Sequence, residues 1–223
     1  KTLKEALIAM ADQPALDFGK HVIPYCHEKG APLYAYEFTG YWKDVGTLSS
    51  YWEANMELID IVPEFNLYEE YWKIYTKSEI QPPDYIAADS IVERSIIGEG
   101  SDIYGEVYNS VIGCGVTIGK GTVIRDSIIM NQTQIGENCE INKAIIAENV
   151  VVGNQVRLGV VEEAENDTAP HNYNHGLVTI GEKSVIPDGI SVGKNSVISG
   201  VTAAADYADS QLASGKTLIK AGE

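Results

Sequence analysis

The sequence is poor in cysteine, in basic residues and in long apolar runs. Its 223 residues include 3 cysteines at wide spacings, which suit neither a disulfide framework nor a zinc site and favour a reducing cytoplasm. The 16 Lys and Arg residues face 32 Asp and Glu residues, and a net charge of −16 argues against binding to nucleic acid or to an anionic membrane. No apolar run approaches the ~20 residues that a membrane-spanning helix needs, and no signal-peptide pattern opens the chain. The composition leaves a globular protein of one or two domains.

Aliphatic residues return through the middle of the chain with a period that fits neither a helix nor a flat strand. Ile112, Ile129 and Ile146 are 17 residues apart, and two further anchors follow each of them in steps of six. The nine anchors are Ile112, Ile118, Ile124, Ile129, Ile135, Ile141, Ile146, Val152 and Leu158. Smaller residues come four positions later, at Val116, Thr122, Thr133, Cys139, Val150 and Val156. This hexapeptide repeat predicts a parallel β-helix, with three hexads in each coil of a triangular prism.

The repeat extends in both directions and is interrupted once. Upstream, Ile97 and Ile103 belong to a shorter coil, and Ile91 is expected near the start of the prism. The downstream anchors are Ile180, Ile186, Val192 and Ile198. The intervening segment, residues 159–178, lacks anchors and is predicted to leave the prism as an excursion that is functional or mobile.

These patterns divide the chain into three parts. The β-helix is predicted over residues 82–201, and the tail over 202–223 is expected to cover an exposed end of the prism or to reach a neighbouring subunit. Before them, residues 1–81 show another pattern. Helical spacing predicts helices over 1–12 and 17–28 that cover a sheet, and alternation predicts a strand over 33–38.

The rest of this first part is predicted to be a capped helix and a connector. Thr47 or Ser49 is expected to cap a helix that runs to Ile59. Residues 64–88 are interpreted as an aromatic connector that docks onto the prism and ends at a domain boundary near Pro82. Its aromatic residues are Tyr68, Tyr71, Trp72 and Tyr75.

Three motifs carry a resemblance to a known family. They are Asp17-Phe18-Gly19-Lys20 with Ile23-Pro24, then Tyr41-Trp42-Lys43-Asp44-Val45-Gly46-Thr47, then Tyr51-Trp52 with Ala54-Asn55. Followed by a left-handed β-helix, they resemble bacterial glucose-1-phosphate adenylyltransferase (ADP-glucose pyrophosphorylase). The resemblance covers the whole chain. It implies a mainly β protein, in which the left-handed parallel β-helix is preceded by the remnant of an α/β nucleotidyltransferase domain.

The resemblance also implies an activity and partners. The family makes ADP-glucose and pyrophosphate from ATP and glucose 1-phosphate in glycogen biosynthesis, and its members are cytoplasmic homotetramers under allosteric control by small phosphorylated metabolites. The Gly-rich loop that cradles the nucleotide phosphates, and the Glu-Lys pair and Ser that hold the sugar phosphate, are missing here. We therefore expect the chain to be a C-terminal portion lacking the N-terminal half, and to be inactive by itself.

Asp44 is the candidate catalytic residue that the resemblance carries over. It matches one of the family's two metal carboxylates, which hold the Mg²⁺ that neutralises charge on the phosphates. The structural alternative is that Asp44 only caps the helix beginning near Thr47. Trp42 and Lys43 either approach the substrate site or pack the end of a strand.

Two alternative functions stay open. In hexapeptide-repeat acyltransferases, a His on a loop leaving the prism deprotonates the acceptor. His171 and His175 lie in such a segment beside several carboxylates, and could instead hold a metal or belong to an acidic, solvated loop. The other alternative is a non-catalytic regulatory subunit of the same enzyme, against which Asp44 argues because such a subunit has no chemical need of a metal ligand.

Two cysteines and six basic residues can be interpreted either as structural or as functional residues. Cys139 is expected inside the prism and Cys114 on its outside, and both are interpreted as inert. Six basic residues could bind phosphorylated effectors or be ordinary surface charge: Lys120, Arg125, Lys143, Arg157, Lys183 and Lys194.

Overall fold

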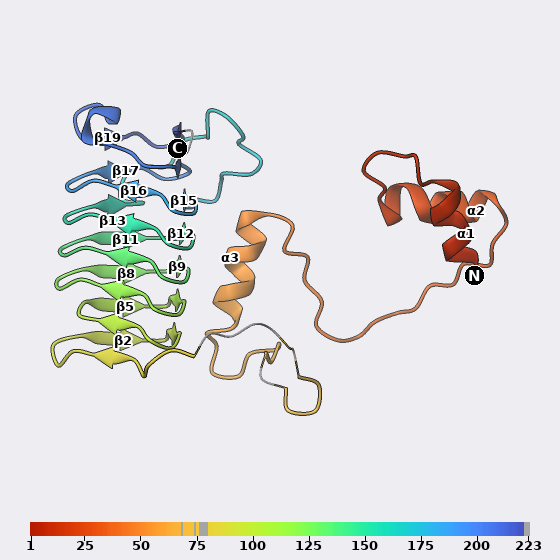
Figure 1. Cartoon of the computed structure of the whole chain (residues 1–223), viewed down its shortest axis with the longest axis horizontal. Helices are drawn as coiled ribbons and strands as arrows, with labels where there is room; N and C mark the ends of the chain where they lie inside the picture. The colour runs from red at the N-terminus through yellow and green to blue at the C-terminus, as the bar shows by residue number, and fades with distance from the viewer. Residues whose placement is uncertain (68, 74, 76–79, 221–223) are drawn as a thin grey trace. The chain divides into compact units, whose positions relative to one another are not determined.

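The computed structural model describes residues 1–67, 69–73, 75 and 80–220 of the chain. It divides into two compact units, Lys1–Gly40 and Tyr41–Glu223. Most of the second unit is a stack of short parallel strands, which Figure 1 shows running from β2 to β19. No helix in the described ranges is long and apolar enough to cross a membrane.

Three parallel sheets form the sides of the prism. The first contains β1 (Tyr85–Ile86), β4 (Asp102–Ile103), β7 (Thr117–Ile118), β10 (Gln134–Ile135), β13 (Val151–Val152) and β16 (Val185–Ile186). The second contains β2 (Ile91–Glu93), β5 (Glu106–Tyr108), β8 (Val123–Arg125), β11 (Glu140–Asn142), β14 (Arg157–Leu158), β17 (Ser191–Val192) and β19 (Gln211–Leu212). The third contains β3 (Ile96–Ile97), β6 (Val111–Ile112), β9 (Ile128–Ile129), β12 (Ala144–Ile146), β15 (Val178–Ile180), β18 (Val197–Ser199) and β20 (Thr217–Ile219).

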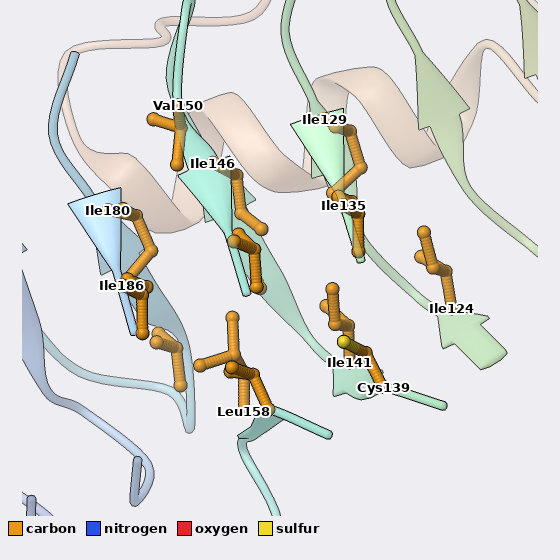
Figure 2. Close-up of a cluster of buried hydrophobic side chains, with 14 of the residues drawn as sticks. Ile124, Ile129, Ile135, Cys139, Ile141, Ile146, Val150, Leu158, Ile180 and Ile186 are labelled. Atoms are coloured by element: carbon orange, nitrogen blue, oxygen red, sulfur yellow. The ribbon is translucent and has the colours of Figure 1, made fainter. Parts of the chain in front are cut away.

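The register stacks each anchor on the anchor of the next coil. Ile135 pairs with Ile118 on one side and with Val152 on the other, so the 17-residue period is one coil. All nine predicted anchors are buried, and Figure 2 shows several of them pointing into the interior. The interior excludes water because the anchors of successive coils stack on one another and cover each other's apolar surface. The predicted left-handed parallel β-helix is confirmed.

The small residues at the predicted positions fill the corners. The Thr122 hydroxyl donates to the Gly136 carbonyl at 2.7 Å and accepts from the Cys139 amide at 3.0 Å. Ser127 likewise accepts from the Ala144 amide at 3.0 Å, one coil further on. These hydroxyls therefore satisfy backbone groups that a corner would otherwise bury without partners.

Some glycines allow the coils to approach closely. A Cβ placed on Gly136 would lie 2.6 Å from the carbonyl oxygen of Gly153, a separation that real Cβ atoms do not adopt. Gly119 stands in the same relation to Gly136 at 2.4 Å. The glycine that follows an anchor is thus a requirement of coil spacing.

The tail continues the prism. Leu212 pairs with Val192 and Leu218 pairs with Ile198, so β19 and β20 add part of another coil. Between the coils, the short 3-10 turn η2 (Ala204–Asp206) brings Tyr207 into the core. The tail covers the end of the prism as expected, but it does so as a coil whose spacing an insertion obscures in the sequence.

The first unit is helical. Its elements are α1 (Thr2–Ala9), the π-helical turn η1 (Phe18–Val22) and α2 (Ile23–Glu28), which pack around Ala6, Val22 and Cys26. Both predicted helices are present. The predicted strand over 33–38 is wrong for this chain, because a strand needs a neighbouring strand to satisfy its backbone and the described residues of this unit offer none.

Helix α3 (Leu48–Glu57) lies against the third sheet of the prism. Its buried contacts are Ile128, Ile145 and Leu177. The helix contributes Leu48, Tyr51, Trp52 and Met56 to this cluster.

The connector that follows α3 does not pack in this way. Tyr71, Trp72 and Tyr75 are almost fully exposed, so the predicted docking of these aromatics is wrong, and Tyr68 lies outside the described residues. The connector precedes the hexapeptide repeat, so its sequence has no periodic pattern that determines where it packs.

Candidate active-site segment

The segment that carries Asp44 is fixed to α3 by alternate residues. Tyr41 donates a hydrogen bond from its hydroxyl to Glu57 Oε2 at 2.7 Å, and Lys43 Nζ lies 2.5 Å from Glu57 Oε1. Lys43 also contacts a Glu53 carboxylate oxygen at 3.3 Å. The intervening Trp42 is exposed, so it does not pack a strand end, whereas Lys43 does pack against the helix.

The charges of this cluster stabilise one another. The hydrogen bond from Lys43, followed by that from Tyr41, lowers the pKa of the Glu57 carboxyl. The same carboxylate raises the pKa of Lys43 and of Tyr41, in each case chiefly through the hydrogen bond. Glu57 therefore stays ionised, Lys43 stays protonated and Tyr41 stays neutral over the neutral pH range.

Asp44 itself is exposed and belongs to the loop. Its Oδ1 accepts a hydrogen bond from the Gly46 amide at 3.0 Å. The cap of α3 is Thr47, whose hydroxyl accepts from the Ser50 amide at 3.1 Å while Ser50 Oγ accepts from the Thr47 amide. Asp44 is therefore not the helix cap, and its carboxylate is presented to solvent.

The donor set around Asp44 fits one ligand of a hard cation. Mg²⁺ takes one or two carboxylates together with water and phosphate oxygens. Among the described residues, no group of three or more His, Cys, Asp and Glu side chains could hold a metal ion. Asp44 is a single exposed carboxylate, a group of the kind that Mg²⁺ takes as a ligand.

The excursion is well anchored to the prism. Strand β14 ends at Leu158 and β15 begins at Val178, as predicted. The buried Asn166 donates to the Asn195 carbonyl at 2.9 Å and accepts from the amides of Thr168 and Ala169. Asn195 in turn accepts from the Gly176 amide at 2.7 Å. These bonds give the buried Asn166 a structural role in holding the excursion against the prism.

The excursion also approaches the loop after Asp44. A shallow hollow is lined on one side by residues 45–48 and Tyr51, and on the other by Asn172 and Tyr173. His171 and His175 are exposed. The sequence placed the 44–48 loop and the excursion in separate parts of the chain, and only the docking of α3 brings them together.

Comparison with known proteins covers both parts of the chain. Residues 4–61 match the family model of nucleotidyl transferases, and residues 84–180 match that of GlmU-like, C-terminal hexapeptide domains. The glucose-1-phosphate adenylyltransferase of Lachnospira eligens is 62% identical over 223 residues, which is 100% of this chain and 53% of the relative. The enzymes of the same name from Acetivibrio thermocellus and Thermotoga maritima are 46% identical over 100% of the chain and 49% identical over 97% of it, and the chain covers 53% and 52% of them.

Over its whole length, the chain is similar to glucose-1-phosphate adenylyltransferases. It spans about half the length of the curated relatives it matches.

Sequence reasoning missed Glu57 and the contacts that Tyr41 and Lys43 make with it. Two signals were available: Tyr41 and Lys43 lie two residues apart, and Glu53 and Glu57 lie one helical turn apart. Nothing in the sequence indicated that the two pairs meet.

Cys139 and four of the six basic residues have partners within the chain. Cys139 is buried, and burial raises the pKa of its thiol, which donates to the Gly153 carbonyl at 3.1 Å. Three of the six basic residues have ordinary surface partners: Arg157 with Glu140, Lys183 with Glu182, and Arg125 over the Tyr108 ring. Lys143 lies over the Trp52 ring.

Proposed function

We propose that this chain is part of a glucose-1-phosphate adenylyltransferase that makes ADP-glucose and pyrophosphate from ATP and glucose 1-phosphate in glycogen biosynthesis. The sequence identity to three enzymes of that name supports the assignment. The observation that carries it in the structure is the exposed Asp44 carboxylate. It lies in the loop before α3, where it accepts a hydrogen bond from the Gly46 amide and does not cap the helix.

The proposed chemistry is the transfer of an adenylyl group. An oxygen of the glucose 1-phosphate attacks the α-phosphorus of ATP, and the bond to the pyrophosphate leaving group breaks. When bound, Mg²⁺ neutralises negative charge on the phosphates during this transfer. Asp44 would be one ligand that holds it. The remaining half of the relatives' length would supply the nucleotide and sugar-phosphate contacts.

The β-helix is proposed to serve assembly and regulation. Its sides are continuous strands whose outward residues are available to neighbours. We propose a cytoplasmic homotetramer that responds to phosphorylated metabolites.

The test measures pyrophosphate release from ATP and glucose 1-phosphate in the presence of Mg²⁺. Three proteins are compared: the 223-residue chain, the full-length protein, and full-length Asp44→Asn with its fold checked by circular dichroism. We expect no turnover by the chain alone, turnover by the full-length protein, and a loss of about two powers of ten in Asp44→Asn, which is about 3 kcal/mol.

Each arm has an outcome that contradicts the proposal. Turnover by the chain alone would show that it carries a complete site. An inactive full-length protein would favour a regulatory subunit, and an Asp44→Asn protein within threefold of the unchanged enzyme would remove Asp44 from the metal site.

A further inference from the structure

The segment from Tyr41 to Asp44 has two different sides. Tyr41 and Lys43 contact α3, whereas Trp42 and Asp44 are exposed. This alternation is what an extended segment produces when one of its sides lies on a helix. The side chains that hold the segment therefore point away from the side that presents Asp44.

One residue receives both contacting side chains. The two carboxylate oxygens of Glu57 are divided between them, with Oε2 accepting from Tyr41 and Oε1 contacting Lys43. The Lys43 side chain is only 21% exposed in this arrangement. The Tyr41 ring is also stacked on Phe65 with centroids 5.3 Å apart, which limits its freedom to follow another partner.

The ends of the segment lie far apart along the helix. Thr47 caps the beginning of α3 and Glu57 is its last residue, so a rise of ~1.5 Å per residue separates the two by roughly 15 Å. Four residues of extended chain from Lys43 to Thr47 reach at most ~14 Å. Together with the reach of the Lys43 and Glu57 side chains, this span lets the segment lie along α3, and Asp44 directly follows the residue that contacts Glu57.

The contacts with Glu57 are exposed, so they add little to global stability. Its side chain is 46% exposed, and ion pairs at such positions contribute ~0–1 kcal/mol. Two hydrogen bonds to one carboxylate nevertheless define a direction for the residues that make them. Their principal effect is on the orientation of the segment.

We propose that Glu57 is a positioning residue for the Asp44 carboxylate, which it orients by holding Tyr41 and Lys43 against α3. The inference rests on the role proposed for Asp44 in adenylyl transfer. It predicts a residue that touches neither substrate nor metal and whose loss changes catalysis without loosening the fold. Removing a group that orients a metal ligand typically lowers metal affinity or activity 10- to 100-fold.

The first experiment measures turnover and Mg²⁺ dependence in the full-length protein. Glu57→Ala is expected to lower kcat 10- to 100-fold or to raise the Mg²⁺ concentration for half-maximal activity by that factor, with Tm unchanged. Glu57→Gln keeps the shape and one acceptor, so its activity should lie between that of Glu57→Ala and that of the unchanged enzyme. The matched control is Glu140→Ala, because Glu140 is 44% exposed and pairs with Arg157 at 3.2 Å on the prism, and it should stay within threefold.

A double mutant tests whether Glu57 acts through Asp44. If it does, Glu57→Ala adds little to the loss already caused by Asp44→Asn, since residues that act as a unit are not additive. Multiplied losses would overturn the proposal, and so would Glu57→Ala activity within threefold of the unchanged enzyme. An inactive parent, or an Asp44→Asn variant without effect, would instead contradict the proposed function.

The second experiment needs no activity. Hydrogen exchange of the peptide covering residues 41–47 should become several-fold faster in Glu57→Ala, because the Gly46 amide is protected only while the loop keeps the Asp44 contact. Glu140→Ala should leave this peptide unchanged. Equal exchange in all three proteins would show that Glu57 does not hold the segment, whatever reaction the enzyme catalyses.

Discussion

Ile135 shows most directly how single residues determine the prism. It is 3% exposed and lies between Ile118 and Val152, with strands of the same sheet on both sides. The sequence placed it there because its neighbours at intervals of 17 have the same character. Periodicity identifies such a residue without knowledge of any other part of the fold.

We expect Ile135→Asp to lower the free energy of unfolding by several kcal/mol, because it buries a carboxylate among aliphatic side chains. Thermal or denaturant unfolding measures the change. Gln134→Asp is the matched control, since Gln134 is the preceding residue of β10 and faces outward, and it should change stability by less than ~0.5 kcal/mol. Similar midpoints for the two variants would contradict the register.

Asp44 marks the limit of prediction at this scale. Resemblance pointed to the residue, but its geometry depends on Glu57, 13 positions later on the far end of a helix. No periodicity links them. Their relation arises from the length of α3 and the reach of the chain before it, which become visible only when both are placed in space.

At the scale of elements, α3 was predictable and its docking was not. Thr47 and the spacing of its apolar residues indicate the helix, and the structure confirms it with Thr47 as the cap. What attaches it to the prism is Trp52, whose indole Nε1 donates to the Asp126 carbonyl at 2.7 Å and whose ring lies 5.1 Å below Lys143 Nζ. A contact across 74 residues of sequence has no local signal.

Trp52→Phe tests this attachment. The variant keeps an aromatic ring but loses the donor, which should weaken docking of α3 by ~1–2 kcal/mol. Hydrogen exchange across residues 48–58 should become about 10-fold faster, at ~1.4 kcal/mol per decade. Trp72→Phe serves as the control because Trp72 is exposed, and exchange in α3 that responds equally to both variants would contradict the assigned contact.

The predicted strand over 33–38 failed for an instructive reason. Alternating side chains describe what a strand would look like, but a strand exists only when its amides and carbonyls find a partner. The β-helix carries its partners within the repeat, whereas residues 33–38 do not. Local pattern is therefore decisive for the prism and insufficient for the unit that precedes it.

At the scale of the whole molecule, the first coil leaves apolar surface open. Ile86 occupies the position that pairs with the buried Ile103, yet it is 52% exposed, and no strand of the described part of the chain pairs with the other edge of β1. Tyr85 and Ile91 are exposed at the same end. An open coil end offers both apolar side chains and strand edges to a second copy.

We therefore expect the chain to self-associate at micromolar concentration. Light scattering should report a mass at least twice the monomer's 24.2 kDa. Ile86→Lys places a charge on the open coil and should shift the population toward monomer, whereas Gln134→Lys, on the side of the prism, should not. A monomer in the unchanged chain would contradict the expectation, and an unaltered oligomer in Ile86→Lys would move the interface elsewhere.

The position of α3 has a consequence for how such proteins can change in length. The helix packs against Ile128, Ile145 and Leu177, which lie in or next to three successive strands of one sheet. Within the prism, each coil stacks on the coils before and after it. Insertions or deletions of one complete coil outside the contacts with α3 would keep every remaining anchor inside, while a change of a single residue would turn the strands inside out. Evolution can thus vary the length of the prism in whole coils without changing the contacts between α3 and the prism that support the Asp44 segment.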